Sequence, residues 1–314
     1  MTAYIIRRLF AMIPVLIVVG VVIFFLIHLT PGDPAAIILG PSAGPEQVAA
    51  LRRELGLDAP LFVQFFTWAG QALTGNLGES IYAHQPVTEI IALHVPPTIS
   101  LTVLSFIFGI VIAIPTALLA VWKRNTLLDS AFMSVSILGV SIPNFWLALV
   151  LILVLAVQFK VLPVSGYVPL EEGVWQWFIH LLLPALVLAV QQAALIARML
   201  RDGMLEVIHQ DYIRTARAKG LGERPVLTKH AFPNAMIPTV TVIGVSLAKL
   251  LGGAVVTEQI FVIPGLGNLL VDSIARRDFP VIQGVILFIA LIYVGVNLLV
   301  DVVYGVLDPR IRYD

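Results

Sequence analysis

Six long apolar runs dominate the chain and restrict what it can fold into. They cover roughly residues 9–29, 98–122, 130–157, 178–200, 235–257 and 281–301. A helix needs about 20 apolar residues to cross the hydrocarbon core of a bilayer, and each run reaches that length. Because the bilayer core offers no water to backbone polar groups, runs this long predict helices. The sequence therefore predicts an all-α integral membrane protein with six transmembrane helices.

The composition fits this class. Of the 314 residues, 59% are apolar and 12% are charged, whereas soluble domains carry about 25% charged residues. The net charge is zero, so the total gives no evidence for a nucleic-acid partner. The chain contains no cysteine, which excludes disulfide scaffolds, iron–sulfur clusters and thiolate metal sites.

The first apolar run, Leu9–Leu29, raises the alternative of a cleaved secretory signal. Such signals have an apolar core of about 7–15 residues and a small-residue cleavage site after it. This run is longer, and no such site follows it. We therefore expect an uncleaved first span.

Lysine and arginine are distributed unequally on the two sides of the expected spans. Six spans place both termini on the same side of the membrane. That side carries Arg7, Arg8, Lys123, Arg124, Arg198, Arg201, Arg214, Arg217, Lys219, Arg224, Lys229, Arg310 and Arg312, whereas the other carries Arg52, Arg53, Lys160, Arg276 and Arg277. Since positive charge accumulates in cytoplasmic loops, this split predicts that both termini are cytoplasmic.

Three segments on the opposite side have structure of their own. Residues 45–57 have the apolar spacing of an amphipathic helix. Residues 59–73 are rich in aromatic side chains, which suit either the headgroup boundary or packing on the outer face of the bundle. Residues 257–284 resemble a helical hairpin or a re-entrant cap broken at Pro264–Gly265.

Motifs for catalysis and for an internal energy source are missing. The sequence contains no GxxxxGK[ST] phosphate loop, no HExxH pair and no EF-hand pattern, and its six histidines are scattered. We therefore expect neither an enzyme nor a metal site or cofactor in this chain. No acid lies near the centre of a span, where a secondary transporter would couple ions. An ion-coupled secondary transporter or a channel that acts without an ATPase remains the alternative.

A polar, basic stretch, DYIRTARAKGLGERPVLTKHAFPNAMIP, separates the fourth and fifth spans at residues 211–238. Its first part favours a helix, which Gly220 allows to end in a reversal. Pro225 can open a second short helix through about Ala231, and Pro233 is expected to stop it. Leu221, Val226 and Leu227 are expected to be exposed beside basic groups, as insertion into a partner's groove requires.

This stretch resembles the EAA loop in the permease subunits of ABC importers, whose pattern is E-A-A-x-x-x-G, nine residues, then I-x-L-P. Gly220 fills the glycine position, Ala216 the second alanine, and Phe232–Pro233 the final pair. Arg214, Thr215 and His230 depart from the general pattern but agree with the dipeptide/oligopeptide/nickel branch. The segments HLTPGDP, LGLDAPLFVQF, GNLGES, FVIPGLGNLL and NLLVDVVYGVLDPRIRY also resemble that branch.

The resemblance implies a type I importer fold and a peptide permease in the bacterial inner membrane. Its implied partners are a second permease subunit, two ATP-binding subunits that hold ATP and Mg²⁺, an extracytoplasmic solute-binding protein, and lipid. It implies a first helix with an external segment (1–94), a transmembrane domain (95–304) with a coupling helix at about 221–231, and a cytoplasmic tail (305–314). The implied contacts with the ATPase are Arg214, Thr215, Ala216, Gly220, Leu221, Arg224, Val226, Leu227, His230 and Asn234.

Polar residues inside the spans are candidates for the lining of a translocation pathway. They include Ser141, Asn144, Gln191, Gln192, Thr241, Ser246 and Lys249. Hydrogen bonding between helices is the alternative role for each uncharged one. Lys249 differs, because a lysine inside a span costs about 2.5–3.5 kcal/mol. It should face a pore, where it could attract a peptide carboxylate, or extend toward the outer surface. Pro115, Pro143 and Pro184 mark either kinks or packing adjustments.

Overall fold

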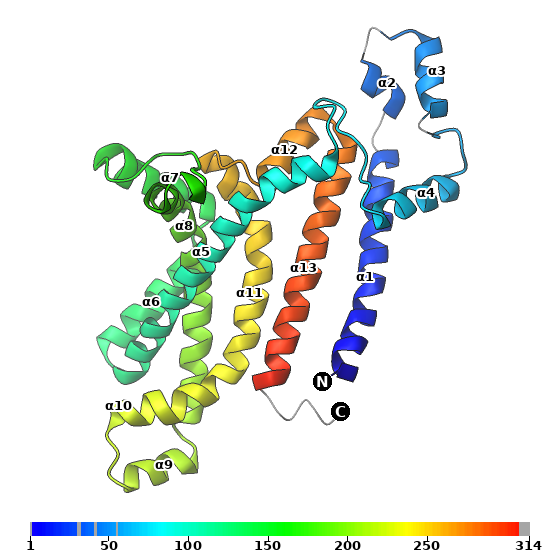
Figure 1. Ribbon diagram of the computed structural model, residues 1–314. Coiled ribbons are helices and arrows are strands. Elements are labelled where there is room, and N and C mark those ends of the chain that lie inside the picture. The colour runs from blue at the N-terminus through cyan, green and yellow to red at the C-terminus, as the bar shows by residue number, and fades with distance from the viewer. Residues whose placement is uncertain (1, 30–32, 41–42, 55, 308–314) are drawn as a thin grey trace. The chain divides into compact units, whose positions relative to one another are not determined.

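A computed structural model describes residues 2–29, 33–40, 43–54 and 56–307, and these are predominantly helical (Figure 1). Within those ranges the β pairing is limited to one isolated bridge between Glu79 and Pro86. Most helices are α-helical, whereas η1 and η3 are π-helical and η2 is a 3₁₀ turn. In chain order they are α1 (Thr2–Leu29), α2 (Pro34–Leu39), α3 (Pro45–Glu54), α4 (Leu61–Leu73), α5 (Val87–Trp122), α6 (Leu127–Ser141), α7 (Asn144–Leu151), η1 (Ile152–Gln158), η2 (Leu170–Glu172), α8 (Val174–Val207), α9 (Asp211–Ala218), α10 (Glu223–Pro225), η3 (Val226–Ala231), α11 (Phe232–Phe261), α12 (Leu266–Arg276) and α13 (Phe279–Leu307).

Among the described residues, four helical stretches are long and apolar enough to cross a membrane, and two sharply bent helix pairs raise the number to six if each pair is one span. The predicted second, fourth, fifth and sixth spans lie within α5, α8, α11 and α13. The first lies within α1, whose apolar stretch Phe10–Phe25 is shorter than a full span and is not one of these six. The stretches that qualify are Val87–Trp122, Val174–Val207, Glu223–Leu250 and Phe279–Val302, with the bent pairs Leu127–Ser141 plus Asn144–Gln158 and Gly252–Phe261 plus Leu266–Arg276.

The third predicted span, 130–157, is interrupted at Pro143, one of the three prolines expected to mark either kinks or packing adjustments, and a kink is what the structure has there. α6 ends at Ser141, and the helix that resumes at Asn144 is bent from it by 104°. Ile142 has the extended backbone that a following proline favours, and Pro143 provides no N–H to continue the helix. Pro115 and Pro184 leave α5 and α8 unbroken.

The chain divides into two compact units. One contains residues 97–267 with the described residues of both chain ends, 2–5 and 295–307, and the other contains residues 6–96 and 268–294. In the first unit, α8 packs against both α6 and α11. Small residues allow this close approach: an added Cβ at Gly139 would lie 3.2 Å from Ala194 Cβ, and one at Gly203 would lie 3.6 Å from Ala235 Cβ. Small residues serve this purpose at helix contacts in membranes, where lipid gives no hydrophobic driving force.

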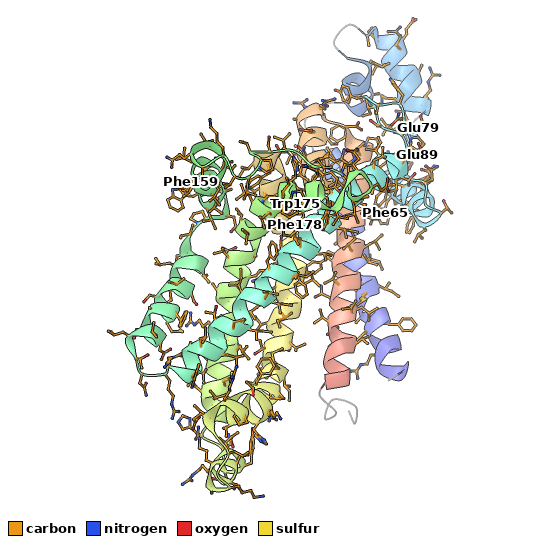
Figure 2. All side chains as sticks on the ribbon, turned by 60° about the vertical axis from the view of Figure 1, so that its left-hand side comes forward. Phe65, Glu79, Glu89, Phe159, Trp175 and Phe178 are labelled. Atoms are coloured by element: carbon orange, nitrogen blue, oxygen red, sulfur yellow. The ribbon has the colours of Figure 1, made fainter. Side chains whose placement is uncertain are left out.

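Aromatic side chains gather around the beginning of α8. Trp175 and Phe178 stack with their ring centroids 6.2 Å apart (Figure 2). Phe108 of α5 meets Phe178 edge-on at 6.3 Å. These contacts link α5 and α8 at the end of the helix pair remote from α9.

An ion pair joins the beginning of α6 to the last part of α8. Arg201 donates to both carboxylate oxygens of Asp129, with Nε–Oδ1 at 2.8 Å and Nη2–Oδ2 at 2.9 Å. The backbone N–H of Asn125 also donates to this carboxylate at 3.2 Å. The Asp129 and Arg201 side chains are only 8% and 16% exposed, so neither can be removed without leaving a poorly solvated charge.

The second unit contains the external segments expected from the sequence. α3 lies within residues 45–57, and α4 lies within the aromatic segment. Phe65 of α4 packs against Phe24 of α1 at 5.4 Å, whereas Phe62 and Phe66 are 65% and 71% exposed. One face of α4 therefore packs on α1, and the other is available to the membrane boundary. In the same unit, Ser80 donates a 2.6 Å hydrogen bond to the buried Asp278.

Candidate functional site

The basic stretch folds into an elbow, which we define as residues 211–231: α9, the turn at Gly220, α10 and η3 (Figure 1). Gly220 has a φ of +83°, which places it in the left-handed region that glycine adopts without cost. Its N–H donates to Arg217 O at 2.9 Å, and the Leu221 N–H donates to Ala216 O at 3.3 Å. This pair of bonds is the Schellman motif, which ends a helix and turns the chain back.

A side-chain ion pair spans the same turn. Arg217 in α9 donates to Glu223 in α10 with Nε–Oε1 at 2.8 Å and Nη2–Oε2 at 3.2 Å. The pair is partly exposed, so its contribution to stability is small, but its bidentate geometry fixes the angle between the two helices. Sequence reasoning missed this contact. The opposite charges on either side of Gly220 were the available signal.

The elbow is anchored by its own hydrophobic side chains. Ile213 and Ala216 of α9 share a buried cluster with Val226 and Leu227 of η3 and with residues of α8. Val226 is fully buried and Leu227 is 6% exposed. The expectation that these two side chains would be exposed was therefore wrong. The elbow has apolar residues on two faces. Val226 and Leu227 lie on the face that α5 and α8 of the same chain cover, and Leu221 lies on the exposed face.

The remaining candidate coupling residues lie mainly on the outside of the elbow. Leu221 is 41% exposed, and Arg214, Thr215 and Arg224 are exposed. Arg214 pairs with Asp211 at 3.4 Å on the surface. His230 is half-buried, and Asn234 donates to its carbonyl at 2.9 Å. Nearby, partial burial raises the pKa of the Tyr212 phenol above its usual value.

The second helix of the elbow does not stop at Pro233, contrary to the sequence expectation. η3 passes directly into α11, and Glu223–Leu250 is one continuous helical stretch. Pro233 is the second residue of α11, but the helix already runs through η3, so its missing N–H removes one backbone hydrogen bond from a continuous helix. The π-helical turns of η3 absorb the steric conflict that would otherwise stop the helix. The elbow is thus joined to the fifth apolar helix without a flexible linker.

Five of the seven candidate pathway residues line one cavity. This cavity measures about 340 Å³ and lies between α6/α7, α8 and α11. Ser141 and Thr241 are exposed and are not among its lining residues. The lining residues are Val140, Asn144, Leu188, Gln191, Gln192, Leu195, Ser246, Lys249, Leu250 and Gly253.

The polar groups of this cavity are partly fixed by the protein. Gln192 donates to Ser246 O at 3.2 Å, and Gln191 donates to Val140 O at 3.4 Å. The Ser246 hydroxyl and the Gln192 Oε1 atom are buried and have no hydrogen-bond partner in the described part of the chain. Lys249 is exposed and forms no ion pair with any described residue. Buried polar atoms normally find partners, so this wall can accept hydrogen bonds from water or a ligand.

A buried acid at the far end of α11 was missed in the sequence. Glu258 is fully buried. It accepts hydrogen bonds from the Thr98 hydroxyl at 2.6 Å and from the Gly267 N–H at 2.7 Å. The Leu266 N–H donates to Thr98 Oγ1 at 2.8 Å. Glu258 and Thr98 therefore cap the first turn of α12, whose axis is bent by 80° from the end of α11.

Glycines make room for this cap. A Cβ at Gly265 or Gly267 would collide with the Glu258 carboxyl. Next to them, Val262 adopts a φ of +53°, a strained conformation for a β-branched residue. The signal in the sequence was an acid a few residues before a glycine-rich break. No group of three or more His, Asp or Glu side chains in the described ranges could hold a metal ion.

Comparison with known families and proteins assigns this architecture. Residues 105–313 match the family model of the binding-protein-dependent transport system inner membrane component. Residues 1–102 match the N-terminal model of the same membrane component. The chain belongs to this family. It is a multi-pass protein of the inner membrane.

Full-length relatives carry the same assignment. The probable peptide ABC transporter permease protein y4tP of Sinorhizobium fredii is 46% identical, and the alignment covers 100% of both chains. The glutathione transport system permease protein GsiC of Escherichia coli is 42% identical, again over 100% of both chains. Both relatives are named as permease components of transport systems.

Solved structures support the fold. The MetNI methionine ABC transporter, in an inward-facing conformation, matches with a TM-score of 0.58 at 20% identity over 70% of this chain and 96% of the matched chain. This likeness supports the type I importer fold expected from the sequence. The roles of the individual elbow and cavity residues stay predictions.

Proposed function

We propose that this inner membrane component is one of two permease subunits of an ATP-driven importer that carries peptides into the cell. The elbow is the observation that carries the proposal. It is a rigid projection, closed by a Schellman turn and anchored to α8, that passes without a break into α11. Such a shape suits the transfer of force from a separate motor.

The proposed partners follow from the family and from the lack of a phosphate loop in the sequence. Two ATP-binding subunits hold ATP and Mg²⁺, a solute-binding protein delivers the peptide from outside, and a second permease subunit completes the pathway. The exposed Leu221 and Arg214 contact an ATP-binding subunit. We place residues 95–304 in the transmembrane domain, with both chain ends in the cytoplasm.

α11 connects the proposed coupling surface to the proposed pathway. One helical stretch begins at Glu223 in the elbow and contains Ser246 and Lys249 of the cavity. Movement of the elbow by the ATPase therefore displaces one wall of the cavity relative to α8. Glu258, on the same helix, carries this movement to the first turn of α12. The cavity is thereby opened or closed by nucleotide turnover in another subunit.

The cavity suits a peptide in its charge and polarity. Lys249 supplies a cation for the C-terminal carboxylate, and Ser246 supplies a buried hydroxyl without a protein partner. Leu188, Leu195 and Leu250 give the remaining wall apolar contact with peptide side chains. Among the described residues no acid lines this cavity, and an acid is the group that an ion-coupled carrier would use.

Reconstitution distinguishes the importer from the ion-coupled alternative. Proteoliposomes that contain both permease subunits, the ATP-binding subunits and the solute-binding protein should accumulate labelled dipeptide only when ATP is supplied to the ATP-binding side. Proteoliposomes with this chain alone should accumulate none under a proton or sodium gradient. Gradient-driven uptake by the isolated chain would reject the proposal.

A further inference from the structure

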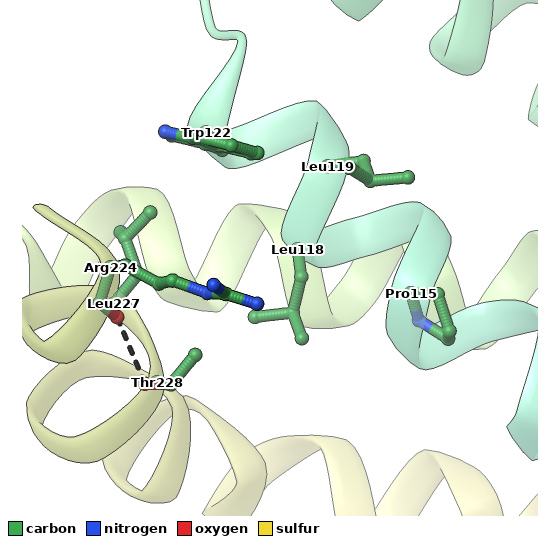
Figure 3. A pocket seen from close by; sticks show the side chains of 7 residues that line it. All are labelled: Pro115, Leu118, Leu119, Trp122, Arg224, Leu227 and Thr228. Atoms are coloured by element: carbon green, nitrogen blue, oxygen red, sulfur yellow. Dashed lines mark hydrogen bonds between the residues drawn. The ribbon is translucent and has the colours of Figure 1, made fainter.

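A second cavity lies away from the pathway, between the end of α5 and the elbow (Figure 3). It measures about 300 Å³. Most of its wall is apolar, with a single arginine at its edge. The lining residues are Pro115, Leu118, Leu119, Trp122, Arg224, Leu227 and Thr228.

The apolar wall continues along α5 as an exposed stripe. Leu119 and Trp122 are 41% and 55% exposed at the cavity. Further along the same helix, Val111 and Ile107 are 60% and 48% exposed, at the helical spacing that keeps them on adjacent turns. The cavity is therefore the end of a long apolar track on a membrane-spanning helix, which suits a hydrocarbon chain.

The rim of this cavity is positively charged. The Arg224 side chain extends from the elbow toward Leu118 (Figure 3) and forms no ion pair with any described residue. The ammonium of Lys123 lies 5.2 Å from the centre of the ring of Trp122, which is part of the cavity wall, and this is a cation–π contact. Arg124 follows directly. The nearby acid, Glu223, is already engaged by Arg217.

We propose that this cavity is a binding site for an anionic phospholipid. The acyl chain lies along Pro115, Leu118 and Leu119, and the phosphate is bound by Arg224 and Lys123. Basic pockets at the ends of transmembrane helices bind such headgroups, and tryptophan favours the same boundary. The proposal rests on the proposed function in one respect. It assumes that the elbow lies in the cytoplasm, which places the site in the inner leaflet.

The bound lipid contacts the elbow and α5 at once. Leu227 is part of both the cavity wall and the buried cluster that anchors the elbow, and Arg224 belongs to α10 of the elbow. The lipid therefore fills the space between the coupling segment and the membrane helix beside it. In membranes poor in anionic lipid, the elbow should lose the contacts with α5 that the bound lipid provides.

Lipid retention by the assembled transporter tests the site. The complex is purified in detergent and equilibrated with phosphatidylglycerol or phosphatidylcholine of identical acyl chains, and bound lipid is counted by native mass spectrometry. We expect phosphatidylglycerol to be retained preferentially and Arg224→Gln to weaken this retention about fivefold, the effect expected for one basic residue at a membrane surface. Arg214→Gln removes the same charge from the exposed side of α9 and should leave retention unchanged.

Four results would overturn the proposal. Equal losses in the two variants would mean that general surface charge attracts the lipid. Equal retention of phosphatidylcholine would mean that the site does not recognise anions, and full competition by free glycerol phosphate would mean that it binds headgroups alone. No effect of Arg224→Gln in the assembled complex would mean that a protein subunit covers the cavity.

A second measurement avoids dependence on the folding of the variants. Phosphatidylglycerol with a photoreactive acyl chain should label the peptide that contains Pro115–Trp122 in the unmodified complex, and labelling confined to other helices would contradict the site. Peptide uptake is measured separately on the same preparation. Loss of ATP dependence with intact, Arg224-dependent lipid retention would reject the proposed function alone.

Discussion

Thr98 and Glu258, 160 residues apart in the sequence, form a 2.6 Å hydrogen bond at a fully buried site. Through this bond and the 2.7 Å bond from Gly267 N–H, the end of α11 determines where α12 begins. Since α11 is continuous with the elbow, the two residues complete a connection between the proposed motor contact and the first residues of α12, after the 80° bend.

Replacement of Glu258 by glutamine tests this cap. One of the two carboxyl oxygens becomes an NH₂ group, so one donor, either the Thr98 hydroxyl or the Gly267 N–H, loses its acceptor. A buried polar group without a partner costs about 1–3 kcal/mol. We expect a lower thermal unfolding midpoint for Glu258→Gln. The control, Glu171→Gln, changes an exposed glutamate and should leave the midpoint unchanged. Equal midpoints for all three proteins would show that the cap contributes nothing.

Removal of one partner of the Asp129–Arg201 pair should destabilise the protein, because the other partner stays buried without its counter-charge. Removal of one partner, as in Asp129→Leu, leaves a poorly solvated guanidinium and should cost about 3 kcal/mol in the free energy of unfolding. The double variant Asp129→Leu, Arg201→Met leaves no charge behind and should recover most of this loss. Asp211→Asn disrupts an exposed pair and should have little effect. Unfolding followed by circular dichroism would show this order, and a double variant no better than the single one would contradict it.

The turn at Gly220 should be essential for import. An added Cβ meets no atom within 4 Å, so a substitution acts through the positive φ, at about 1–2 kcal/mol for an L residue. We expect Gly220→Asp to abolish ATP-driven import while the protein still inserts into the membrane, and Gly220→Val to do the same. Gly222→Ala is the matched control, because Gly222 has an ordinary φ of −67°. Normal import by either Gly220 variant would remove the argument for a rigid elbow.

Lys249 should distinguish peptides by their C-terminal group. A hydrogen bond to a charged partner contributes about 1.5–3 kcal/mol, so Lys249→Met should reduce uptake of a free-acid dipeptide at least about tenfold. Uptake of the C-amidated dipeptide should change little, and Lys249→Arg should preserve the preference. If the methionine variant lost both substrates equally, or neither, then Lys249 would not contact the carboxylate.

Hydrophobic periodicity and length predicted most of the fold, because a span must cover the bilayer with apolar residues. They could not predict which prolines break a helix. Pro143 ends α6 and bends the chain by 104°, whereas Pro184 lies within an unbroken α8. The difference depends on whether neighbouring helices support the freed carbonyl, which is a property of the packing.

The candidate sites were predictable to a similar extent. The turn at Gly220 and five of the seven polar residues could be named from the sequence before the structure placed those five around one cavity, because glycine at a helix end and polar groups within spans stand out; their role in a pathway stays a prediction. The burial of Val226 and Leu227 could not be predicted from the sequence, since an apolar residue in a basic loop can pack against its own chain or against a partner. Glu258 was overlooked because an acid after an apolar run also marks the end of a span.

The contact between the elbow and an ATP-binding subunit is the central claim, and a cysteine placed at Leu221 tests it most directly. The chain has no cysteine of its own, so any cross-link reports that position, and the fully buried Val226 provides the control site. With a short bifunctional thiol reagent in intact cells, Leu221→Cys should cross-link to the ATP-binding subunit, and Val226→Cys should not. If Leu221→Cys were instead labelled by a membrane-impermeant reagent from outside, or formed no cross-link to an ATP hydrolase, the account would be contradicted.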